Sequence, residues 1–198
     1  MKIASLPENE AERLRILHNL SILDTAPEDI FDDLTRLASQ ICNTPIALVS
    51  LIDADRQWFK SSIGMTMPET SRDIAFCSHA ILQTDLFLVL DTSIDERFFD
   101  NPLVSGEPHI RFYAGTPLIT SEGAALGTLC VLDQKPRELS IEQAESLKII
   151  TRQVVRQIEQ RRDLASLAQI SLEIHQIGEK LRLSQERFEL AILGSSGG

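Results

Sequence analysis

Residues 46–64 read IALVSLIDADRQWFKSSIG, and this stretch decides the fold. Its first seven residues form a nearly continuous apolar run between Pro45 and Asp53, which predicts a central strand covered on both faces. The polar residues 53–56 predict a turn, and residues 57–64 predict the returning strand of a hairpin. The domain is therefore expected to form around an antiparallel sheet.

A second hairpin is predicted from residues 110–119 and 124–133, which flank the turn residues 120–123. If the turn is that short, Tyr113 lies opposite Cys130. Alternate residues of a strand share one face of a sheet. We therefore expect one face to carry Arg111, Tyr113, Thr128 and Cys130.

Capping signatures predict the helices of the N-terminal region. Ser5 opens a predicted helix over residues 5–20, and Thr25 opens a second one that Asn43 ends. The second helix carries one apolar stripe at helical spacing, made of Ile30, Leu34, Leu37, Ala38 and Ile41. A short capped helix is predicted over residues 70–81 and a strand over residues 86–90.

From Ser140 the sequence predicts one long helix, which a Ser140-x-x-Gln143 capping box opens. Its apolar residues form two stripes in different frames, with a phase slip at residues 161–165. The first stripe is expected to pack partly on the domain and consists of Leu147, Ile150, Val154 and Ile158. The second alternates steps of three and four residues, which is typical of a coiled-coil seam, and consists of Leu167, Ile170, Ile174, Ile177, Leu181, Ser184 and Phe188.

The composition argues against several classes of function. With 29 acidic and 19 basic residues the formal net charge is −10, so the chain lacks the basic surface that nucleic-acid binding needs and is disfavoured on anionic membranes. No apolar run reaches membrane-spanning length, and no signal-peptide stretch opens the chain. Three widely spaced cysteines without a Cys-x-x-Cys pair indicate reduced thiols and a cytoplasmic location.

Short motifs follow one another in an order that resembles the GAF domain family over residues 14–162. The motifs that carry the resemblance are LDTAPE at 23–28, IALVSLID at 46–53, QWFKS at 57–61, FCSHAI at 76–81, NPLV at 101–104, IRFYAG at 110–115 and GTLCVLD at 127–133. They look like the GAF subgroup found at the front of bacterial sensor histidine kinases and diguanylate cyclases. The tail at residues 184–192 looks like the helix that opens a PAS domain.

The resemblance implies an α+β fold with a GAF-like central antiparallel sheet, helices on one face and a pocket on the other, and the apolar periodicity adds a long C-terminal coiled-coil helix. The resemblance also implies a homodimer formed through the helices. The expected parts are a sensory domain with N-terminal helices at 1–139, the C-terminal helix of that domain at 140–162, a signalling coiled coil at 163–192 that runs into a PAS-like start, and a flexible end or truncated next domain at 193–198.

The pocket face defines the candidate ligand-binding residues, which are Phe76, Cys77, His79, Arg111, Tyr113, Thr128 and Cys130. The small molecule that they would bind, and any cofactor, stay unassigned. Plainer interpretations compete with this one: Cys77 as a buried thiol, His79 as a capping or hydrogen-bonding residue, and Arg111 as a member of a structural ion pair at the sheet edge.

Other kinds of site have weaker support. Cys77 and His79 stand two residues apart on a predicted helix, so they point in different directions and do not share a metal. Attachment of a linear tetrapyrrole to Cys77 is disfavoured, because Ser78 separates this cysteine from the histidine. His175 lacks the acidic neighbour and the proline motif of a phosphoacceptor histidine. No catalytic or metal-binding residue is therefore predicted.

These expectations describe a sensory input module of a multidomain bacterial signalling protein. It would relay a small-molecule or redox state to a C-terminal effector, a histidine kinase or a diguanylate cyclase, and would not itself be an enzyme. Two alternatives stay open. One is a thiol-dependent enzyme of the same fold, such as a methionine sulfoxide reductase, and the other is a dimerisation spacer without a ligand.

Overall fold

The computed structural model describes the backbone of residues 1–195 and the side chains of residues 1–183. The chain divides into two compact units, one of residues 1–159 and one that begins at Gln160. The predicted seam positions Ser184 and Phe188 have side chains outside the described residues, as does the whole PAS-like segment at 184–192.

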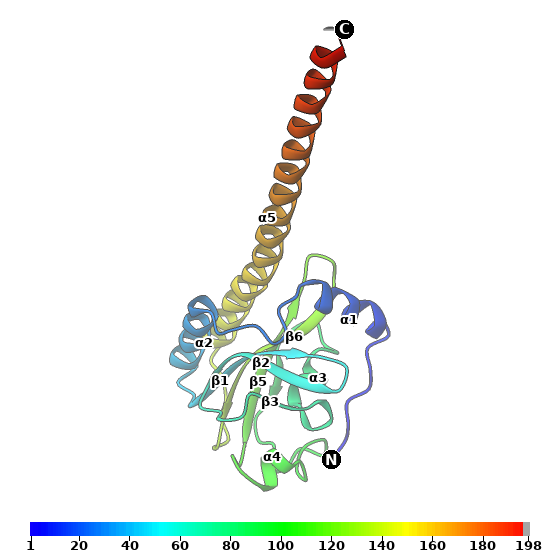
Figure 1. Ribbon diagram of the computed structural model, residues 1–198. Coiled ribbons are helices and arrows are strands. Elements are labelled where there is room, and N and C mark those ends of the chain that lie inside the picture. The colour runs from blue at the N-terminus through cyan, green and yellow to red at the C-terminus, as the bar shows by residue number, and fades with distance from the viewer. Residues whose placement is uncertain (196–198) are drawn as a thin grey trace. The chain divides into compact units, whose positions relative to one another are not determined.

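One antiparallel sheet of six strands forms the centre of the first unit, in the order β3-β2-β1-β6-β5-β4 (Figure 1). Its strands are β1 (Ile46–Ile52), β2 (Arg56–Ile63), β3 (Glu69–Ser71), β4 (Phe87–Val89), β5 (Phe112–Ile119) and β6 (Ala125–Asp133). All seven residues of β1 are buried, as expected for a central strand that is covered on both faces. The predicted α+β fold with a central antiparallel sheet is confirmed.

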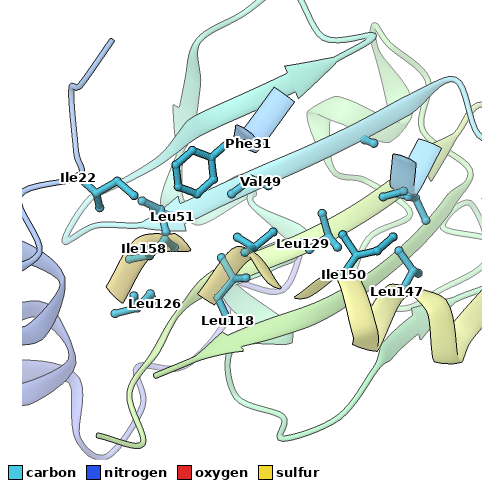
Figure 2. Packing of buried hydrophobic residues seen from close by; sticks show 14 of the residues in the cluster. Ile22, Phe31, Val49, Leu51, Leu118, Leu126, Leu129, Leu147, Ile150 and Ile158 are labelled. Atoms are coloured by element: carbon cyan, nitrogen blue, oxygen red, sulfur yellow. The ribbon is translucent and has the colours of Figure 1, made fainter. Parts of the chain in front are cut away.

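Three helices pack on one face of this sheet: α1 (Glu10–Asn19), α2 (Asp29–Cys42) and the first turns of α5 (Ile141–Ser195). Figure 2 shows Leu147, Ile150 and Ile158 of α5 among buried side chains of the strands. Each large apolar side chain removed from water contributes about 1.5–3 kcal/mol to folding. The first stripe of the long helix is therefore part of the domain core, as predicted.

The opposite face of the sheet carries shorter elements. These are η1 (Arg72–Ile74), α3 (Phe76–Ala80), α4 (Pro102–Ser105) and the loops between them. They form a second apolar cluster with alternate residues of β1, β5 and β6, including Leu48, Tyr113 and Cys130. Successive strand residues point to opposite faces, so each central strand contributes side chains both to this layer and to the helical layer.

Two predicted helix starts are wrong by four or five residues. α1 begins at Glu10 rather than Ser5. The segment before it contacts a distant loop, where the N–H of Lys2 donates to the carbonyl of Arg97 at 3.1 Å. α2 begins at Asp29 rather than Thr25, because the Thr25 hydroxyl donates to the Ile22 carbonyl at 2.7 Å and caps no helix. In each case a proline follows the predicted cap by two residues, and the residue before a proline is driven out of the helical conformation.

The predicted helix at residues 70–81 is divided at Ala75, which adopts an extended conformation between η1 and α3. The carbonyl groups that a continuous helix would use accept hydrogen bonds from side chains. The amide of Asn101 donates to the Ile74 carbonyl at 2.9 Å, and the hydroxyl of Ser78 donates to the Arg72 carbonyl at 3.0 Å. Contacts from a distant loop therefore decide this local structure.

The residues of the apolar stripe predicted on α2 do not share one environment. Ala38 is buried, whereas Ile30 and Leu37 keep 42% and 43% of their surface exposed. The buried side of α2 is made of Phe31, Thr35, Ala38 and Cys42. This helix is apolar on more than one side, so periodicity alone did not identify the side that faces the sheet.

The β5–β6 hairpin has a different register from the predicted one. Tyr113 pairs with Leu132, and Cys130 pairs with Gly115. The turn is one residue longer than predicted, since Thr120 N–H donates to the carbonyl of Ala124 at 3.0 Å, and the register shifts again between Pro117 and Ile119. Two single-residue shifts add up to two residues, so each side chain keeps its predicted face.

The start of α5 follows the predicted capping box. The Ser140 N–H donates to Gln143 Oε1 at 2.9 Å, and the Gln143 N–H donates to Ser140 Oγ at 3.2 Å. In the second unit the predicted seam residues at positions 167–181 are exposed, and the exposed fraction is 62% for Leu167 and 64% for Ile174. None of the described helices combines the length and the apolarity needed to cross a bilayer.

Candidate functional site

Polar and thiol side chains meet in the middle of the face that α3 covers. Tyr113 of β5 and Thr128 and Cys130 of β6 point to this face, and α3 supplies Cys77 from above. Each of these four residues is at most 2% exposed. Ser50 of β1 joins them, since its hydroxyl lies 3.2 Å from Thr128 Oγ1. We call these five residues the thiol cluster.

Hydrogen bonds in the thiol cluster converge on one sulfur atom. Thr128 Oγ1 donates to Cys77 Sγ at 3.0 Å, and the Tyr113 hydroxyl donates to the same sulfur at 3.3 Å. Cys130 Sγ lies 3.8 Å from Cys77 Sγ, and both thiols are free. Buried polar groups need partners, and these side chains supply them to one another.

This geometry favours a thiolate at Cys77. Burial opposes its ionisation, but hydrogen bonds from Cys130, Ser50, Thr128 and Tyr113 lower the pKa of Cys77 to about 7. Burial and the neighbouring sulfur raise the pKa of Cys130 well above its ordinary value. Burial likewise raises the pKa of Cys42, on the other face of the sheet, to about 11. Within the thiol cluster, Cys77 therefore ionises more readily than Cys130.

Aromatic rings surround the cluster and fix its position. Phe76 stacks on Tyr113 with ring centroids 5.4 Å apart, and Phe98 lies 4.7 Å from Phe76. Gly115 makes room for the tyrosine, because a Cβ atom there would overlap the Tyr113 hydroxyl and lie 2.7 Å from its Cζ atom. The space where the sequence predicts a ligand pocket is therefore occupied by side chains that contact one another.

Two of the seven predicted site residues lie apart from this cluster. His79 Nε2 is 3.0 Å from the carbonyl oxygen of Lys2, and its ring meets Phe98 edge-on. The Arg111 guanidinium donates to the carbonyls of Val104 and Ile110 at 2.8 and 2.9 Å. It therefore holds the loop before β5, and the ion pair considered for it is absent among the described residues. The structure brings together the other five, namely Phe76, Cys77, Tyr113, Thr128 and Cys130.

Ser50 is the member of the cluster that was not predicted from the sequence. The signal that could have identified it is a single hydroxyl inside the apolar run of residues 46–52. A buried serine in a central strand needs a hydrogen-bond partner, and Thr128 on the neighbouring strand provides it.

We expect one thiol of the folded chain to titrate with a midpoint near pH 7, because the pKa of Cys77 is lowered to about 7. Ultraviolet absorbance of the thiolate measures this step, and Cys77→Ser should abolish it. Thr128→Val removes one donor and should raise the midpoint by about one unit. Cys42→Ser is the matched control and should leave the step unchanged. A titration without any thiol step below the ordinary value of about 8.5 would contradict the cluster geometry.

Comparisons with known proteins agree with this architecture. The family model described as "GAF domain" matches residues 26–158. The GAF domain of an Acinetobacter phosphoenolpyruvate-protein phosphotransferase superposes with a TM-score of 0.56 at 15% identity, over 81% of this chain and 99% of that one. The phycocyanobilin-bound GAF domain of a cyanobacterial phytochrome gives 0.55 at 14% identity, over 79% and 97%. At these identities the two structures show the fold alone.

One curated relative is much more similar in sequence. A cyclic di-GMP phosphodiesterase from Pseudomonas aeruginosa is 47% identical over 131 residues, which are 66% of this chain and 22% of the relative. The chain thus spans about a fifth of that relative's length. The relative is named as an enzyme, and this contradicts the prediction that the chain is not one. That prediction rested on motifs in residues 14–162 alone, whereas most of the relative lies outside the matched segment.

Proposed function

Because the chain belongs to the GAF domain family, we propose that it is the sensory input module of a multidomain bacterial signalling protein that hydrolyses cyclic di-GMP. The effector in this proposal follows from the relative that shares 47% of its residues over the matched segment. It replaces the histidine kinase or diguanylate cyclase expected from the sequence. The proposed location is the cytoplasm, where reduced thiols persist.

The observation that carries the proposal is that α5 is buried at its start and exposes apolar side chains farther along. Leu147, Ile150, Val154 and Ile158 are buried in the domain core, with exposed fractions of 0–4%. Later residues of the same helix present exposed apolar side chains at seam spacing, including Leu167, Ile170 and Ile174. A change in the domain core therefore acts directly on a helix that can pair with its equivalent in a second copy.

The thiol cluster is the proposed sensing centre. It lies on the face opposite the helices and shares β1, β5 and β6 with them. A ligand between α3 and the sheet, or a change in the state of Cys77, would disturb the packing of Phe76 and Tyr113. Packed interiors contain little free volume, so they switch between discrete arrangements of side chains. The strands would transmit such a change of packing to the helical layer.

The test compares two cysteine variants of the full-length protein. Cys77→Ser alters the thiol cluster, whereas Cys42→Ser alters a buried thiol in the opposite layer. We expect Cys77→Ser to change the rate of cyclic di-GMP hydrolysis by at least about threefold, and to abolish its response to peroxide and thiol reductants. Cys42→Ser should keep both the rate and the response. Equal rates and responses in the two variants would refute the cluster as the sensing centre.

A second candidate function is supported by the 3.8 Å separation of Cys77 Sγ and Cys130 Sγ. Two thiols at this distance could reduce a sulfoxide. The Cys77 thiolate would attack the sulfoxide sulfur, and the oxygen would leave as water with the two thiol protons. Cys130 would then attack Cys77 Sγ, so that the bond from Cys77 to the substrate sulfur breaks, a Cys77–Cys130 disulfide forms and the thioether, methionine, is released. Turnover of methionine sulfoxide with a thiol reductant, lost in Cys77→Ser, would establish this activity. A dimerisation spacer is tested by native mass spectrometry, because a stoichiometric bound molecule would exclude it.

A further inference from the structure

We propose that the first unit has a second binding site, which takes a small organic phosphate of the nucleotide kind. The site is a groove of about 430 Å³ between α5 and the end of β5. We call it the basic groove, and its principal lining residues are Lys148, Arg152, Arg156, Thr116, Pro117 and Val155. It shares no residue with the thiol cluster, so the proposal is independent of the proposed function.

The charge of the basic groove is poorly compensated. Lys148, Arg152 and Arg156 stand four residues apart, so they follow one face of α5. Lys148 Nζ pairs with Asp85 at 2.9 Å and with Glu145 at 3.3 Å. Arg152 and Arg156 are exposed and make no ion pair within the described residues.

Two carboxylates also line the groove, and both have other partners: Asp85 pairs with Lys148 Nζ. The Oε1 atom of Glu159 accepts from the N–H and the hydroxyl of Ser121, both at 2.8 Å. Like charges one helical turn apart destabilise a helix. Two unpaired guanidinium groups in a chain with a net charge of −10 therefore point to an anion that neutralises them.

A second, independent observation comes from the floor of the groove. Thr116 is 7% exposed and lines the groove, and its hydroxyl has no hydrogen-bond partner. A buried hydroxyl without a partner costs free energy, and native structures contain few of them. The oxygen atom of this hydroxyl is itself closed to solvent, so a ligand oxygen would satisfy it only after a small shift of the groove wall.

The lining also indicates the class of ligand. Guanidinium groups match the geometry of phosphate oxygens and can bind them in a bidentate manner. Pro117, Ile119 and Val155 give the same groove an apolar wall, which suits a sugar or a base better than water. A phosphate that carries a ring system therefore fits this groove better than inorganic phosphate does.

The test is isothermal titration of the chain with GMP and, separately, with inorganic phosphate. We expect GMP to bind at least about tenfold more tightly than phosphate, and the double variant Arg152→Gln, Arg156→Gln to lose at least about tenfold in affinity. Arg36→Gln is the matched control, because Arg36 is an exposed arginine of α2 outside the groove. It should bind GMP like the parent chain.

Thr116→Val distinguishes a site from a general charge effect. It removes the unpaired hydroxyl at nearly constant shape, so the melting temperature without ligand should stay the same or rise while GMP affinity falls. Equal affinity of the parent chain and the double arginine variant for GMP would overturn the proposal, as would an absence of GMP binding. Equal affinities for GMP and inorganic phosphate would overturn the assignment to an organic phosphate.

Discussion

Gly127→Ala is expected to destabilise the domain by about 3 kcal/mol or more. Gly127 of β6 pairs with Leu51 of β1 at the centre of the sheet. A Cβ atom at this position would overlap the carbonyl oxygen of Ser50 and lie 2.7 Å from the Cα atom of Leu51. Both are backbone atoms of a strand that is buried along its whole length, so neither can move without breaking the β1–β6 pairing.

Urea unfolding measures this effect through the fluorescence of Trp58, the single tryptophan, which is 8% exposed. A loss of this size is a large part of the 5–15 kcal/mol that stabilises a typical domain. Gly178→Ala is the control, since the added methyl group would meet nothing within 4 Å. That change should raise the helix content slightly, because alanine is about 1 kcal/mol better than glycine inside a helix. An unchanged urea midpoint for Gly127→Ala would contradict the close approach of the two strands.

The elements that sequence periodicity predicts well are those in which local pattern and burial agree. The apolar run of residues 46–52 became β1, and the first stripe of the long helix entered the core. The second hairpin kept its faces although the register was wrong by two residues. A longer turn and an irregularity between Pro117 and Ile119 each add one residue. The longer turn has no distinct signal in the sequence, whereas Pro117 could have indicated the irregularity, because a proline cannot donate to the strand ladder and is found at bulges.

The candidate site was predictable only in part, for a similar reason. Tyr113, Thr128 and Cys130 share a face because strand residues alternate, and this alternation can be read from the sequence. The positions of His79 and Arg111 depend on partners that periodicity cannot supply. His79 meets the carbonyl of Lys2, 77 residues away, and Arg111 meets the carbonyl of Val104 in α4, seven residues earlier in the chain. Contacts with other elements of the fold therefore decided which polar residues belong to the site.

The largest functional effect is expected from the double variant Ile170→Asp, Ile174→Asp in the proposed dimer. These residues are 52% and 64% exposed in the single chain, and they follow the alternating three- and four-residue steps of a seam. Burying a large apolar side chain contributes about 1.5–3 kcal/mol, and a symmetric dimer would bury each of them twice. Aspartates at these positions would also face their equivalents as like charges. The dissociation constant should therefore rise at least about a hundredfold.

Analytical ultracentrifugation over a range of protein concentrations measures this constant. Leu172→Asp is the matched control: Leu172 is 60% exposed on the same helix, but it falls outside the seam frame of Leu167, Ile170 and Ile174. It introduces one of the two negative charges of the seam variant, between the two substituted seam positions, and it should leave the dimer almost intact. If Leu172→Asp dissociated the dimer as strongly as the seam variant, helix propensity or net charge would account for the result, and the predicted seam would be wrong. A parent chain that stayed monomeric at every concentration would remove the physical basis for relay through paired helices.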